Sequence, residues 1–103
     1  MKIKNLATAV ACGALIAGVS MAEDWDMPMA YSATNFHSEM GVVFAEKVRD
    51  YTSGEINITV HPGGSLFKGG EIKRAVQTGQ APIGERFMSA HANEAPLLGW
   101  DNL

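Results

Sequence analysis

Five residues in three separate stretches have side chains that could bind a small ligand: Asn35, Phe36 and His37, then Lys68, then Glu85. An amide, an aromatic ring and an imidazole in succession suit a small polar ligand. Glu85 could accept hydrogen bonds from ligand hydroxyl groups, and Lys68 could attract an anion. We take these five residues as the candidate ligand-binding set and rank Lys68 below Asn35, Phe36 and His37.

Two members of this set also have ordinary structural explanations. Phe36 could start the apolar face of a helix instead of facing a ligand. Glu85 is followed by Arg86, and the two could form a solvated surface ion pair, which contributes little to stability. The sequence alone leaves both alternatives open.

The glycine-rich stretch from His61 to Glu71 reads HPGGSLFKGGE and could suggest a phosphate-binding loop. Such a loop needs lysine and then serine or threonine directly after its second glycine. Here Gly69 is followed by Gly70 and Glu71, and a carboxylate at a helix start would repel phosphate. We therefore predict a sharp corner between a strand and a helix, and no nucleotide site.

The patterns of enzymes and metal sites do not fit this sequence either. The histidines at positions 37, 61 and 91 lack the i, i+4 spacing of a helical zinc site. Ser65 stands in GGSLF, which is not the nucleophile motif G-x-S-x-G, and the single cysteine is Cys12. We predict no catalytic residue, no metal and no cofactor, and hence a protein that is not an enzyme.

The N-terminus has the pattern of a secretory signal peptide at residues 1–22. Lys2 and Lys4 precede an apolar run from Leu6 to Val19, and Ser20-Met21-Ala22 offers small residues for cleavage. The run is too short to span a membrane. We therefore predict export to the periplasm, with no membrane insertion of the cleaved chain.

The remaining chain, residues 23–103, is acidic. Loss of Lys2 and Lys4 changes the formal net charge from −3 to −5, because all 11 acidic residues remain. No basic stripe is left, which argues against binding to nucleic acid or to anionic membranes. Without cysteine, the chain also has no disulfide to support its small core.

The hydrophobic pattern predicts five alternating elements. The expected order is strand, helix, strand, helix, strand, at residues 26–31, 36–51, 55–60, 71–78 and 81–84. This alternation predicts an α/β fold with a parallel or mixed sheet and flanking helices. Ligands bind such sheets at the carboxyl ends of the strands, which is where Asn35-Phe36-His37, His61 and Glu85 fall.

The expected helix at 36–51 has the clearest pattern in the sequence. Its apolar residues recur at helical spacing, and we expect them to face the core. They are Phe36, Met40, Val43, Phe44, Val48 and Tyr51. Gly54 stands where the helix should stop.

Two segments carry a family resemblance, FAEKVRDYTSGEINITVHPGGSL and EIKRAVQTGQAPIGE. Through them, residues 23–103 resemble the N-terminal part of the periplasmic solute-binding proteins of TRAP transporters, the DctP-type family. The resemblance implies a two-lobed binding protein, of which these residues form the incomplete N-terminal lobe. It also implies that Asn35, Phe36, His37 and Glu85 lie in ligand-facing loops.

The implied partners are a small organic acid and the sodium-coupled TRAP membrane permease. A sugar acid such as a uronate, or a dicarboxylate, is the expected kind of ligand. The arginine that pairs with the ligand carboxylate in this family lies in the second lobe, and Arg86 does not match its position. Two alternatives remain: a non-functional truncated fragment, and a periplasmic α/β enzyme.

Overall fold

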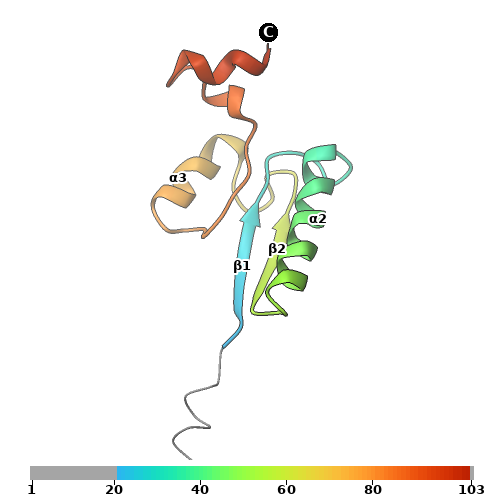
Figure 1. Cartoon of the computed structure of the whole chain (residues 1–103). Helices are drawn as coiled ribbons and strands as arrows, with labels where there is room; N and C mark the ends of the chain where they lie inside the picture. Colours follow the sequence, from blue (N-terminus) through green and yellow to red (C-terminus); the bar gives the residue numbers. More distant parts are fainter. Residues whose placement is uncertain (1–20, 103) are drawn as a thin grey trace, which may run out of the picture.

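The computed structural model describes residues 21–102, and Figure 1 shows their arrangement. Strands β1 and β2 span Glu23–Pro28 and Ile56–His61, and helices α2 and α3 span Phe36–Tyr51 and Ile72–Gln77. Three short 3₁₀ helices cover Gly69–Glu71, Met88–His91 and Pro96–Asn102. The predicted signal peptide lies outside the described residues except for Met21 and Ala22. Within residues 21–102, no helix has the length and apolar character needed to cross a bilayer.

The two strands form a parallel sheet, which confirms the predicted α/β class. Trp25 pairs with Ile58 and Met27 with Val60, and α2 makes the connection between the strands. Figure 1 shows α2 lying along β2, with α3 on the other side of β1. Ile72 of α3 contacts the region of Gly84, where an added Cβ would come within 2.7 Å of the isoleucine side chain.

The strand boundaries differ from the predicted ones, whereas α2 has the predicted bounds. The first strand was predicted at 26–31 and is found at Glu23–Pro28, because the Glu23 N–H already donates to Glu55 O at 2.7 Å. The second strand and the second helix each differ from their predicted bounds by one residue at both ends.

The predicted third strand at 81–84 is wrong. Among the described residues, this segment forms only an isolated parallel bridge between Met29 and Glu85. The Glu85 N–H donates to Pro28 O at 3.2 Å. Pro82 has no N–H to donate, which removes one of the hydrogen bonds a longer strand would need.

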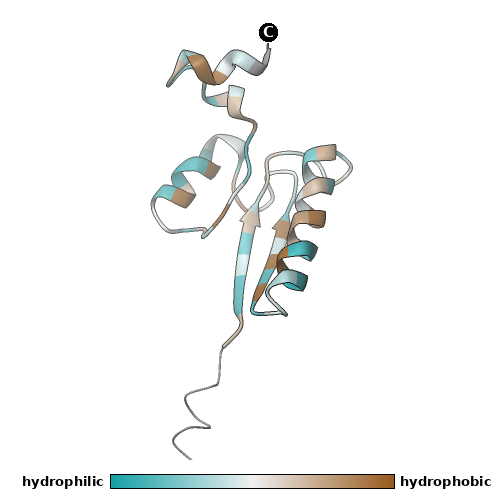
Figure 2. Cartoon of the chain, in the orientation of Figure 1, coloured by the Kyte–Doolittle hydropathy of each residue, from teal (hydrophilic) through white to brown (hydrophobic). Residues whose placement is uncertain are grey.

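The predicted buried face of α2 is also wrong. Phe36, Met40 and Phe44 are 66%, 59% and 45% exposed. The residues of α2 that are buried are Ser38, Gly41 and Ala45. These small residues let the helix approach the sheet closely: a Cβ on Gly41 would collide with the Met29 sulfur. Figure 2 shows hydrophobic colouring in the middle of α2 and hydrophilic colouring toward its C-terminal end.

The glycine-rich stretch forms the predicted corner. Gly63 and Gly64 have φ values of 67° and 68°, a left-handed conformation that favours glycine. Their N–H groups donate to Tyr31 O and Met29 O, at 2.6 and 2.9 Å. The amides that could have held a phosphate are therefore used to join this corner to the end of β1.

The last described segment, residues 88–102, is joined to α3 by a small group of charged side chains. Lys73 donates a hydrogen bond to the Glu94 carboxylate, and His91 Nδ1 lies 3.2 Å from the other Glu94 oxygen. The hydrogen bond from Lys73 is the main cause that holds the pKa of Glu94 below its usual value of 4.5.

Acidification should loosen this junction. A lowered folded-state pKa gives a stabilisation that is present above pH 4.5 and is lost as the pH falls through the lowered pKa. The effect is small because the group is exposed. Amide hydrogen exchange at Ala95, whose N–H donates to His91 O, should report faster local opening as the pH falls below 4.5 and through the lowered pKa of Glu94. Glu94→Gln should remove this pH dependence, and an unchanged dependence in the variant would contradict the assignment.

Candidate functional site

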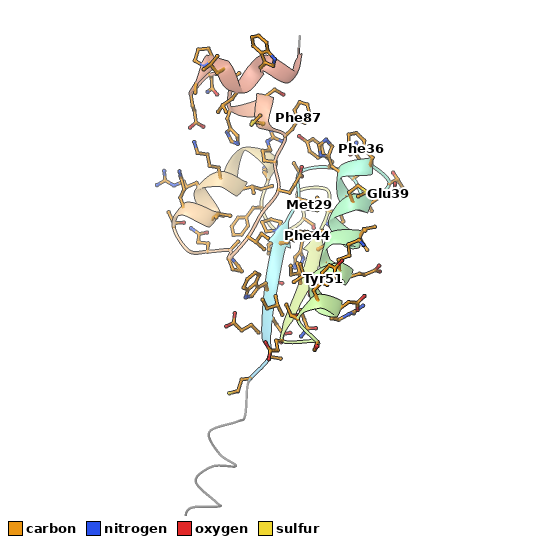
Figure 3. All side chains as sticks on the ribbon, in the orientation of Figure 1. Met29, Phe36, Glu39, Phe44, Tyr51 and Phe87 are labelled. Carbon is orange, nitrogen blue, oxygen red and sulfur yellow. The ribbon has the colours of Figure 1, made fainter. Side chains whose placement is uncertain are left out.

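An open cavity of about 370 Å³ lies between α2 and the segment that follows α3. Met27 and Met29 of the first strand region form one wall. The other wall-forming residues are Phe36, His37, Met40, Gly41, Phe44, Ile83, Gly84 and Glu85. Figure 3 labels Met29 near the end of β1, and Phe44 and Phe36 on α2, with Phe36 at the start of the helix. The walls are mostly apolar, with His37 and Glu85 as the polar side chains.

His37 and Glu85 meet at one end of this cavity. The distance between His37 Nδ1 and Glu85 Oε1 is 2.8 Å, and the side chains are 21% and 31% exposed. The N-cap of α2 positions His37, because Asn35 Oδ1 accepts a hydrogen bond from the His37 N–H at 3.0 Å. The bridge to Met29 positions Glu85. Two backbone anchors therefore place an imidazole beside a carboxylate.

Aromatic rings surround the His37 imidazole. Its centroid lies 4.2 Å from that of Phe36, 4.8 Å from that of Tyr31 and 5.5 Å from that of Phe87. The Arg86 guanidinium lies 5.9 Å from the centre of the Tyr31 ring, within the range of a cation–π contact. These contacts restrict the orientation of the imidazole.

Two buried polar atoms near this cluster have no hydrogen-bond partner among the described residues, Glu85 Oε2 and Arg86 Nε. An added Cβ on Gly69 would come within 2.9 Å of the Arg86 guanidinium carbon. The glycine-rich corner therefore also provides room for Arg86. Its side chain lies between that corner and Tyr31.

Comparisons with known proteins give a clear result for this fold. The structure matches a TRAP solute-binding protein from a marine metagenome, specific for pyroglutamate and solved with co-purified pyroglutamate, with 82% identity and a TM-score of 0.76. The match covers 80% of this chain and 27% of that one. This chain belongs to the TRAP solute-binding proteins. No family model matches it.

Two further TRAP solute-binding structures show the spread of the family. DctP6 of Bordetella pertussis, an extracytoplasmic solute receptor binding pyroglutamic acid, is 44% identical, with a TM-score of 0.74 over 79% of this chain and 27% of its own. A protein from Sulfurospirillum deleyianum with bound succinate is 25% identical, with a TM-score of 0.68 over 76% and 26%. This chain thus spans about a quarter of the length of these relatives, so the described fold is an incomplete lobe of a TRAP solute-binding protein.

In this TRAP solute-binding chain, three of the five predicted site residues come together. Phe36, His37 and Glu85 line the cavity. Asn35 stands next to it, but its side-chain oxygen is used to cap α2. Lys68 is exposed and is not one of the residues that line the cavity. Contact of any of the five with a ligand stays a prediction.

Sequence reasoning missed Tyr31 and Phe87, which complete the aromatic surround of His37. Tyr31 stood at the end of the expected first strand, so the strand-end rule could have included it. Phe87 lies two positions beyond Glu85, and no local pattern marked it. Phe87 was missed because its contact with His37 joins two segments that are far apart in the sequence.

The other two histidines have carboxylate partners outside the cavity. His61 Nε2 lies 2.8 Å from Asp26 Oδ1, and His91 pairs with Glu94. Within residues 21–102, no cluster of three or more His, Cys, Asp and Glu side chains could hold a metal ion.

Proposed function

We propose that this chain forms part of the first lobe of the periplasmic binding component of a TRAP transporter. The complete protein would capture an organic acid anion and deliver it to the sodium-coupled membrane permease. The 82% identity to a pyroglutamate-specific TRAP solute-binding protein is the observation that carries this proposal. Export by the predicted signal peptide at residues 1–22 fits the same function.

Pyroglutamate is the ligand that we propose first. The two more similar relatives described above bind it, whereas the succinate-bound relative is only 25% identical. The apolar walls of the cavity suit the ring carbons of such a ligand, and His37 with Glu85 offers a polar contact at one end. Uronates and open-chain dicarboxylates are the ligands expected from the sequence, and we use them as the ligands to compare with pyroglutamate.

The proposed mechanism is capture between two lobes. The two lobes would close over the ligand, so that its binding energy shifts the equilibrium from open to closed. The family resemblance assigns the carboxylate-pairing arginine to the second lobe, and no residue of this chain takes that role. Residues of this lobe would therefore orient and select the ligand, with no chemical step.

Thermal unfolding of the full-length protein that contains this chain tests the proposal. We expect pyroglutamate to raise the Tm, because ligand at about 100 times Kd stabilises the bound form by about 2.7 kcal/mol. Succinate and galacturonate should give smaller shifts. Mass spectrometry of the recovered ligand should show it unchanged. If no organic acid shifts the Tm, or if the ligand is converted, the proposed function is wrong.

A further inference from the structure

We infer that His37 Nε2 is the atom of this lobe that accepts a hydrogen bond from the ligand, while Glu85 acts as a positioning residue behind it. This inference rests on the proposed function and makes it more specific. It selects organic acids that carry an N–H or O–H donor over acids that carry none. Sequence reasoning had instead placed the Glu85 carboxylate against the ligand.

The Glu85 carboxylate is poorly placed to contact a ligand directly. Its Oε1 is paired with His37 Nδ1 at 2.8 Å. Its Oε2 is buried and has no hydrogen-bond partner within residues 21–102. Because Oε2 is buried, a ligand donor could reach it only if the Glu85 side chain moved. In this arrangement Glu85 orients the His37 imidazole and does not contact the ligand.

The carboxylate determines which nitrogen of His37 carries the hydrogen. Because an ionised carboxylate can only accept, we assign a hydrogen to His37 Nδ1, which lies 2.8 Å from Glu85 Oε1. In the neutral imidazole, Nε2 is then left with a free lone pair. Histidine–carboxylate pairs orient metal-binding imidazoles in the same way.

The Nε2 atom is available for a hydrogen bond. His37 lines the cavity, and its Nε2 is not one of the buried polar atoms without a partner. The rings of Phe36, Tyr31 and Phe87 hold the imidazole plane. Figure 3 shows Phe36 at the start of α2 and Phe87 near that end of the helix. The acceptor is therefore preorganised.

A fixed acceptor requires a ligand that donates. Pyroglutamate has a ring N–H, whereas succinate at neutral pH has only acceptor oxygens. A site with a buried hydrogen-bond acceptor binds a ligand without a donor more weakly, because the acceptor then stays unpaired in the complex. The apolar wall formed by Met27, Met29 and Phe44 would then face the ring carbons. The predicted ligand class is a small cyclic acid with a ring N–H.

The first experiment compares two ligands that differ in one atom. Calorimetry on the full-length protein would measure the Kd of pyroglutamate and of 5-oxotetrahydrofuran-2-carboxylate, in which a ring oxygen replaces the N–H. We expect the oxygen analogue to bind about tenfold more weakly or worse. Equal affinities would overturn the inference and leave the proposed function intact. Failure of both ligands and of the other acids to bind would overturn the proposed function itself.

The second experiment changes the histidine. His37→Phe keeps an aromatic ring but removes the acceptor, so pyroglutamate should bind about tenfold more weakly and lose its advantage over the oxygen analogue. His61→Phe is the matched control, because His61 also pairs with a carboxylate at 2.8 Å but does not line the cavity. It should keep both the affinity and the preference. A full preference in His37→Phe would contradict the inference.

The third experiment separates positioning by Glu85 from direct contact. Glu85→Gln still offers an oxygen to His37 Nδ1–H and should restore much of the preference that Glu85→Leu loses. Histidine ¹⁵N spectra should show the Nδ1–H tautomer and a shift of Nε2 with pyroglutamate but not with the oxygen analogue. These spectra remain decisive if His37→Phe does not fold. An Nε2–H tautomer, or equal losses in the two Glu85 variants, would overturn the inference.

Discussion

Replacing Met29 by alanine should lower the free energy of unfolding of the full-length protein by about 2–5 kcal/mol, the usual cost of such a truncation in a core. Met29 is only 1% exposed, and its sulfur lies against Gly41 of α2. A glycine has no side chain that could move into the space left behind. The loss should therefore lie in the upper part of this range.

Urea denaturation would measure this change. Met88→Ala is the matched control, because Met88 is exposed and belongs to a 3₁₀ helix away from the sheet. We expect that control to stay within about 0.5 kcal/mol of the unmodified protein. A loss below about 1 kcal/mol for Met29→Ala would mean that α2 and β1 move together to fill the space left by the Met29 side chain, and that Met29 does not hold them together.

Residues 23–102 expressed alone should self-associate at about micromolar concentration, because partly covered apolar surfaces aggregate in that range. The face of α2 that borders the cavity exposes Phe36, Met40 and Phe44, and Tyr51 is exposed at the end of the helix. Contiguous apolar surface of this kind is unusual on a stable monomer. About three quarters of the length of the relatives lies outside this chain and could supply the cover.

Light scattering after gel filtration, together with binding of an apolar dye, would test this expectation. The double substitution Met40→Lys and Phe44→Lys should reduce both association and dye binding. Val76→Lys is the control, because Val76 is an exposed apolar residue of the other helix, α3. If the isolated residues are monomeric and bind no dye, the face of α2 does not need a cover.

The two experiments together address the truncation alternative. If residues 23–102 associate when isolated but the full-length protein binds the ligand, these residues act as one part of a larger lobe. The ligand tests concern the preference for a ring N–H at His37, whereas the denaturation test concerns the packing of Met29, which also lines the cavity, against Gly41. Failure in one set does not decide the other.

The helix of residues 36–51 and the strand after it could be predicted from the sequence because their signals are local. Apolar spacing, an N-cap at Asn35 and a glycine at position 54 all lie within or next to the element that they define. The glycine-rich corner was also predictable, since only glycine readily takes its φ values. The family resemblance came from the same continuous segments.

Only the tertiary structure decided which face of α2 is buried and which side chains meet. The apolar stripe suggested the wrong face, because close contact with the sheet requires small residues such as Gly41 and Ala45. His37 and Glu85 are 48 positions apart, and their contact depends on the N-cap of α2 and on the bridge between Met29 and Glu85. The sequence alone determined the positions of the main elements, through local propensity, and showed which residues follow the strands. Packing between distant elements determined that Glu85 faces His37, because no short-range pattern records which side chains a sheet brings together.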